Sequence, residues 1–145
     1  MANLLDYCSD LPTRSFAKGE TVLEEDVKDG VILILKSGAV EVVKHGTTVT
    51  TIGNRGAMLG DMAVLLGRGH TASAVATQDS EFYVLEHAGE RLEADPKLYR
   101  EIARGLAARL LRQSERNIEL QDRLDIDSDG EGELDRRLAM MWGLE

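Results

Sequence analysis

Residues 60–75 read GDMAVLLGRGHTASAV, and this stretch does most to decide the fold. Gly60 opens a short apolar helix, a Gly-x-Gly loop at 67–69 ends it, and a strand of small residues follows. Glycine permits tight turns and close backbone approach, and the first N–H groups of a helix lack partners within it. Backbone N–H groups can therefore converge on one bound phosphate, which predicts a protein that senses a nucleotide rather than transforms one.

Short strands punctuated by glycines are expected from Thr13 to about Glu86. Their spacing is typical of a compact barrel or sandwich with a jelly-roll character. The expected fold class is therefore mainly β with C-terminal α: a β-roll barrel, a short helix within 60–75 and a long C-terminal helix. The expected strands are 21–23, 31–35, 39–43, 48–52, 72–76 and 81–85, with turns at Lys18-Gly19, Asp29-Gly30, Ser37-Gly38, His45-Gly46 and 53–56.

A long helix is expected from Asp95 and Pro96 to about Leu124, because Asp caps helices well and Pro suits the first helical position. Residues spaced alternately by three and four along it are typical of a seam between paired helices, which predicts a homodimer. A second stripe, Ile102, Leu111 and Ile118, predicts packing on the barrel. The seam consists of Ala103, Leu106, Leu110, Gln113, Asn117, Leu120 and Leu124.

The C-terminal segment is expected to lie outside the main domain, which spans residues 1–125. Acidic residues at alternate positions predict a solvated linker at 126–133, and apolar spacing predicts a short amphipathic tail helix at 134–145. Residues 125–130 match the first half of a calcium loop, but the twelfth position holds Arg136 instead of a carboxylate. An acidic linker is therefore favoured over a calcium site. Leu138 and Trp142 predict docking of the tail on the parent domain, with docking to another protein as the alternative.

Composition excludes several classes of function. The 145 residues carry a formal charge of -9, which argues against binding nucleic acid or an anionic membrane. The single cysteine, Cys8, excludes an internal disulfide and favours an intracellular, cytoplasmic protein. No signal peptide, membrane span or catalytic motif is recognised in the sequence, so we expect neither an enzyme nor a required cofactor.

The motifs are similar to those of the cyclic nucleotide-binding domain family, which includes catabolite activator proteins and protein kinase A regulatory subunits. The family's phosphate-binding cassette reads Gly-Glu-x-Ala-Leu, a loop, then Arg-Ser/Thr-Ala-Thr/Ser-Val. This chain reads Gly60-Asp61-Met62-Ala63-Val64, then His70-Thr71-Ala72-Ser73-Ala74-Val75, after turns at Lys18-Gly19-Glu20 and Lys36-Ser37-Gly38. The resemblance covers about residues 12–125, and it implies a ligand such as cAMP or cGMP. The implied ligand-binding residues are Gly60, Asp61, Met62, Ala63, His70, Thr71, Ala72, Ser73, Gln113 and Ser114.

Two departures fall on the family's anchoring side chains. Asp61 replaces the glutamate that hydrogen-bonds the ribose, and it is one methylene shorter. His70 replaces the arginine that binds the phosphate, and a mostly neutral imidazole lacks the permanent charge and forked geometry of a guanidinium. Affinity is therefore expected to be lower than with arginine, and higher near pH 6 than at neutral pH, where His70 is less protonated. Arg68 offers a second cation.

Other interpretations stay open at this point. His70 is either a ligand contact or a surface loop histidine, and His45 and His87 are interpreted as surface residues. Gln113 and Asn117 serve either a purine base or the register of paired helices. The domain either signals ligand binding to a partner protein or acts as a ligand-independent dimerisation or docking module. A cyclic dinucleotide or another anion is the third option for the ligand.

Overall fold

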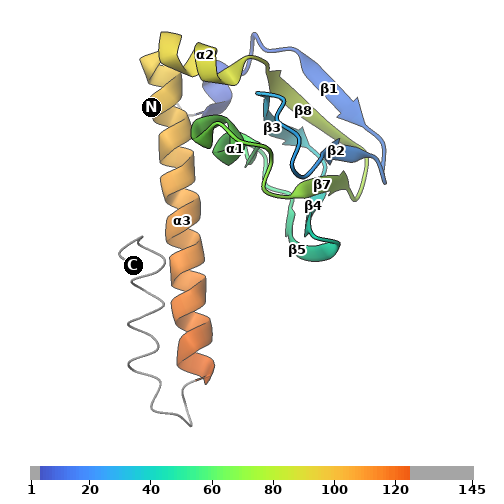
Figure 1. Ribbon diagram of the computed structural model, residues 1–145, viewed down its shortest axis with the longest axis vertical. Helices are drawn as coiled ribbons and strands as arrows, with labels where there is room; N and C mark the ends of the chain where they lie inside the picture. The colour runs from blue at the N-terminus through green and yellow to red at the C-terminus, as the bar shows by residue number, and fades with distance from the viewer. Residues whose placement is uncertain (1–3, 125–145) are drawn as a thin grey trace. The chain divides into compact units, whose positions relative to one another are not determined.

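The computed structural model describes residues 4–124 (Figure 1). Within them, antiparallel strands form two four-stranded sheets with the orders β1-β8-β3-β6 and β2-β7-β4-β5. The sheets do not close into a complete barrel, and the mainly β jelly-roll class with a C-terminal helix is confirmed. The strands are β1 Thr13–Phe16, β2 Thr21–Leu23, β3 Ile32–Ser37, β4 Val40–Lys44, β5 Thr47–Ile52, β6 Met58–Leu59, β7 Ser73–Ala76 and β8 Ser80–Leu85.

The core lies between the two sheets. Phe82 of β8 is fully buried and meets Phe16 edge to face, with 5.8 Å between ring centroids. Strand β3 is buried on both faces, since Ile32 and Ile34 are covered as well as Leu33 and Leu35, and side chains alternate between the faces of a strand. Helix α1, Asp61–Leu66, contacts β3. The core cluster comprises Val22, Leu23, Leu33, Leu35, Val40, Leu59, Ala74, Ala76, Phe82 and Val84.

Helix α3, Pro96–Leu124, begins and ends where the sequence predicts. The Asp95 carboxylate accepts the N–H of Leu98 at 3.2 Å, which is the expected cap. On this helix, Leu110, Leu120, Gln113 and Asn117 of the predicted seam are exposed. Only the first residue of the second stripe is buried: Ile102 is covered, whereas Leu111 and Ile118 are exposed.

Several elements differ from the sequence expectations. Strand β1, strand β6 and the 3-10 helix η1, Leu4–Tyr7, were not predicted. Helix α2, Ala88–Ala94, precedes α3 and is separated from it by Asp95, which has an extended backbone. Turns are present at Lys18-Gly19, at His45-Gly46 and within 53–56, and the chain bends at Gly38. Asp29-Gly30 forms no backbone turn, although Gly30 has a positive φ and the Asp29 carboxylate accepts the N–H of Val31.

The chain divides into two compact units, Met1–Ile102 and Ala103–Glu145. The predicted linker at 126–133, the tail at 134–145 and the calcium-like motif at 125–130 lie outside the described residues. The boundaries assigned to them stay predictions. Between residues 4 and 124, the structure has no helix long and apolar enough to span a bilayer. Nor does that range contain a group of three His, Cys, Asp or Glu side chains able to hold a metal ion.

The thiol of Cys8 is buried and donates a hydrogen bond to the carbonyl of Leu4 at 3.3 Å. Burial raises the pKa of this thiol from its ordinary value of 9.0 to about 11, because the thiolate loses solvation. Since the thiolate is the reactive form, iodoacetamide is expected to modify native Cys8 at least about 100-fold more slowly than unfolded Cys8 at about pH 8. Mass spectrometry of timed reactions, with the chain in guanidinium as control, measures this ratio. Equal rates would contradict the buried thiol.

Candidate functional site

Helix α1 lies between two glycines, as predicted. Gly60 and Gly67 have φ of 85° and 65°, and the N–H of Gly67 closes the helix on the carbonyls of Ala63 and Val64. Both glycines adopt the left-handed conformation that other residues rarely take. We call residues 60–75 the cassette. Its helix starts and stops at positions fixed by the local sequence.

Gly60 is also a point of close backbone approach in the cassette. A Cβ built on Gly60 would lie 2.5 Å from the carbonyl oxygen of Val31 and 3.0 Å from Cε1 of His70. Only glycine fits here without displacing the backbone. The imidazole of His70 therefore lies directly against the residue that opens α1.

His70 makes three polar contacts with residues 24–31. These residues connect β2 to β3, and we call them the 24–31 loop. Its N–H donates to the carbonyl of Val27 at 3.0 Å, and its own carbonyl accepts the N–H of Asp26 at 2.8 Å. The Nε2 atom lies 2.8 Å from Oδ1 of Asp29. The side chain is only 3% exposed, so the interpretation of His70 as a surface histidine is wrong. Its Nδ1 atom is buried and has no hydrogen-bond partner among the described residues.

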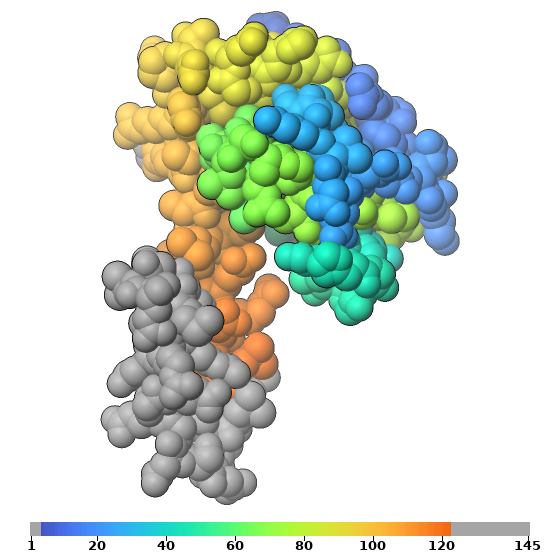
Figure 2. All heavy atoms as spheres, viewed as in Figure 1, coloured from blue at the N-terminus to red at the C-terminus, as the bar shows by residue number. Residues whose placement is uncertain are grey.

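The 24–31 loop contacts the rest of the cassette as well. A Cβ on Gly69 would lie 2.5 Å from the carbonyl oxygen of Asp26, so a glycine is required for the loop to approach. The carbonyl of Gly30 accepts the N–H of Ala88, the first residue of α2, at 2.9 Å. Figure 2 shows this loop, in blue, against the green cassette. One loop thus connects the cassette to α2.

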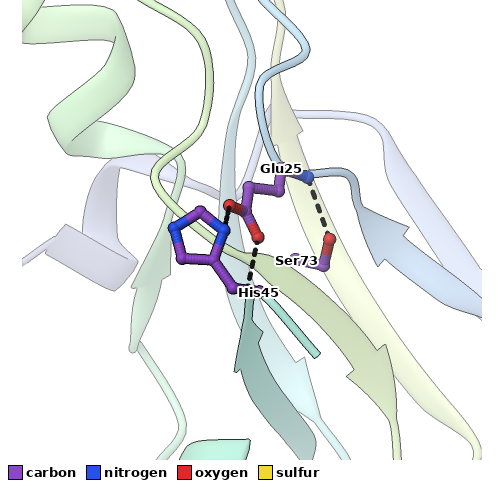
Figure 3. Close-up of polar contacts among 3 residues, drawn as sticks. All are labelled: Glu25, His45 and Ser73. Atoms are coloured by element: carbon purple, nitrogen blue, oxygen red, sulfur yellow. Dashed lines mark hydrogen bonds and ion pairs between the residues drawn. The ribbon is translucent and has the colours of Figure 1, made fainter. Parts of the chain in front are cut away.

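Glu25, in the same loop, joins the cassette strand to the β4–β5 turn (Figure 3). Its N–H donates to Oγ of Ser73 at 2.9 Å, and its carboxylate accepts the N–H of His45 at 3.0 Å. The carboxylate also lies 3.0 Å from Nδ1 of His45, whose side chain is 78% exposed. Serine, histidine and glutamate lie close together here, but the serine oxygen bonds the backbone of Glu25 and not the imidazole. The contacts are therefore those of a structural junction rather than of a nucleophile and its base.

The structure brings together the predicted cassette residues. Asp61 is 2% exposed and takes part in an interaction within the chain, whereas Met62 is exposed and Ala63 is buried. Thr71, Ala72 and Ser73 are half-buried at the start of β7, and Arg68 is exposed.

The two predicted residues outside the cassette, Gln113 and Ser114, lie on α3 in the second unit. Gln113 is exposed. Ser114 is buried, and its hydroxyl has no hydrogen-bond partner within residues 4–124. Their role toward a ligand stays a prediction.

Sequence reasoning missed Asp29, the partner of the His70 ring. The two residues are 41 positions apart, and nothing in the sequence marks Asp29 beyond its place in an Asp-Gly turn. The N–H of Val31 donates to the same oxygen at 3.1 Å, which fixes the carboxylate within its own turn. Asp29 therefore belongs to the candidate site.

Comparisons with known proteins find similar folds. A domain from Methylobacillus flagellatus KT, described as cyclic nucleotide-binding, is 24% identical over 79% of this chain and 70% of its own, with a TM-score of 0.64. The catabolite activator protein of Thermus thermophilus is 27% identical over 83% of this chain, with a TM-score of 0.62. This chain spans 58% of that protein.

A Geobacter metallireducens GS-15 protein described as cyclic nucleotide-binding is 25% identical over 70% of this chain and 76% of its own, with a TM-score of 0.60. No curated protein sequence matches the chain. The family model described as the cyclic nucleotide-binding domain matches residues 13–89, which is more than half of the chain. The chain therefore belongs to the cyclic nucleotide-binding domain family.

Proposed function

We propose that this chain is a regulatory domain that binds a cyclic mononucleotide, cAMP or cGMP, in the cassette and signals the bound state to a partner protein. The observation that carries the proposal is the buried His70 ring, which lies against Gly60 with Nδ1 left without a partner. A buried polar atom without a partner is costly, so an incoming hydrogen-bonding group has an advantage at this place.

The proposed contacts divide between phosphate and nucleoside. Gly60, Met62 and Ala63 offer backbone N–H groups at the start of α1, Asp61 would contact the ribose, and His70 would contact the phosphate. Around β7, Thr71 and Ser73 contribute hydroxyls, and Ala72 contributes its N–H. Gln113 and Ser114 would contact the purine base, and the α3 seam would join two copies of the chain. A cytoplasmic location is part of the same proposal.

Transmission of the bound state would use the 24–31 loop. This loop bonds His70 through Asp26, Val27 and Asp29, and it bonds the start of α2 through Gly30. A ligand that prefers one arrangement of this loop shifts the balance between its arrangements by its difference in affinity. The hydrogen bond from Ala88 to Gly30 supports α2 as the element that responds.

Titration calorimetry with cAMP and cGMP, paired with thermal unfolding, tests the proposal. Ligand at 100 times its dissociation constant is expected to stabilise the chain by about 2.7 kcal/mol, which raises the thermal midpoint by several degrees. A cyclic dinucleotide and inorganic phosphate serve as comparison ligands. An unchanged midpoint with millimolar cAMP and cGMP, in both wild type and His70→Arg, would overturn nucleotide binding.

A ligand-independent dimerisation or docking module is the second candidate function. The observation favouring it is that Nε2 of His70 is already bonded to Asp29, while Leu110 and Leu120 of the seam are exposed on α3. Light scattering of wild type and of a Leu110→Asp, Leu120→Asp double variant, with and without cAMP, distinguishes the two. A dimer that is lost in the variant and indifferent to nucleotide supports the module.

A further inference from the structure

We infer that Asp29 is a positioning residue of the cassette and that ligand binding at His70 takes up one proton from solution. This inference rests on the proposed function, and it adds a residue and a form of regulation to that site. It is carried by the contacts of the two nitrogens of His70, one bonded to Asp29 and the other buried without a partner.

The contact with Asp29 decides which nitrogen of the neutral ring carries hydrogen. A carboxylate only accepts hydrogen bonds, so the 2.8 Å contact requires that Nε2 of His70 donates. Asp29 is itself fixed by the N–H of Val31, and its side chain is 39% exposed. In the neutral ring, Nδ1 therefore carries no hydrogen and presents only its lone pair.

That lone pair is poorly suited to an anion. Nδ1 lies 3.5 Å from a Cβ built on Gly60, the residue that precedes α1. It has no donor or acceptor partner within residues 4–124. A phosphodiester oxygen only accepts hydrogen bonds, so it repels the lone pair on Nδ1 of the neutral ring. The imidazolium, in contrast, donates Nε2–H to Asp29 and Nδ1–H to the phosphate, and both bonds are then charge-assisted. Binding thus selects the protonated ring.

The proton could in principle be taken up by another charged group in the 24–31 loop or the cassette. On the 24–31 loop, Asp26 and Lys28 are exposed, and Asp26 meets His70 through its backbone. In the cassette, Arg68 is exposed and carries a permanent charge, while Asp61 is buried and takes part in an interaction within the chain. The proton is therefore assigned to Nδ1 of His70. It comes from the buffer and returns to it when the ligand leaves.

Calorimetric titration with cAMP and cGMP in two buffers of different ionisation enthalpy measures proton uptake directly. We expect proton uptake when the ligand binds, and an affinity that falls as the pH rises, by up to about tenfold per pH unit for one proton taken up. Asp29→Asn keeps an oxygen acceptor but loses the charge, so it should weaken binding and reduce the uptake at a given pH. His70→Arg should bind without uptake.

The matched control removes the other two histidines. His45 and His87 both have positive φ, which asparagine tolerates, so His45→Asn with His87→Asn should keep the full proton uptake. Uptake that persists in His70→Gln, or that disappears in this double variant, overturns the assignment to His70.

Further outcomes separate the inference from the proposed function. Binding of cAMP or cGMP by wild type with no buffer dependence of the heat overturns the inference and leaves nucleotide binding intact. No binding by wild type or by His70→Arg overturns both. Nitrogen-15 NMR of the free chain tests Asp29 without ligand: hydrogen is expected on Nε2 of neutral His70, and hydrogen on Nδ1 would overturn the positioning role.

Discussion

Replacing Gly60 by alanine is expected to destabilise the chain by about 3 kcal/mol and to remove ligand binding. The left-handed backbone at φ 85° costs a residue with a Cβ about 1–2 kcal/mol. The new Cβ would also lie 2.5 Å from the carbonyl oxygen of Val31, which is backbone and cannot rotate away. The start of α1 must then move away from His70. Thermal unfolding should show a midpoint lower by about 10 °C, and cAMP titration should show no heat of binding.

Gly46→Ala is the matched control for this effect. Gly46 has a similar φ of 80°, but a Cβ built there meets nothing within 4 Å. We expect it to cost about 1 kcal/mol, since it adds backbone strain without a clash, and to leave ligand binding in place. If the two variants lose equal stability, close approach at Gly60 is not what requires glycine.

His70→Arg is expected to tighten cyclic nucleotide binding by about 10- to 100-fold at about pH 8. A charge-assisted hydrogen bond contributes about 1.5–3 kcal/mol, and an imidazole does not reproduce the forked geometry of a guanidinium. The guanidinium carries its charge at every pH, and Asp29 remains as a second partner for it. Calorimetric titration of wild type and His70→Arg with cAMP and cGMP measures the difference.

His87→Arg provides the control for charge alone. His87 is exposed just before α2, and the substitution adds the same positive charge outside the cassette. We expect an affinity within about twofold of wild type, because exposed charges at a distance are screened by salt. An equal gain in both arginine variants would mean that net charge, and not the position of residue 70, limits binding.

The cassette could be predicted because its signals are local. Gly60 and Gly67 fix the ends of α1 through their own backbone conformations, and Asp95 with Pro96 does the same for the start of α3. These residues act on their immediate neighbours, so their pattern along the chain is enough. The strands with apolar runs, such as β3, were found for the same reason.

Other elements gave no such signal. Strand β1 lies at the end of its sheet and is largely exposed, so it lacks the apolar alternation by which strands are recognised. Strand β6 has only two residues and exists through pairing with β3. Helix α2 contains Gly89, which obscures a helical pattern.

Asp29 lies beyond sequence prediction for a different reason. Its role depends on the fold bringing the 24–31 loop against His70, and on Gly69 permitting that approach. Residues 24–31 read EEDVKDGV, in which any of four acidic residues could have met the histidine. The choice among them is made by tertiary structure alone.

The contacts of Glu25 with His45 lie beside an edge strand that favours aggregation of concentrated protein. Strand β5 reads TTVTTI, lies at the end of its sheet and leaves Val49 exposed. An uncharged edge strand of this kind, without proline or glycine, is a template on which other chains can add strands and grow fibrils. The two contacts between Glu25 and His45 fasten the hairpin that carries this strand. Concentrated stocks are therefore best protected by charging the edge, for example with lysine at Val49, rather than by altering the core.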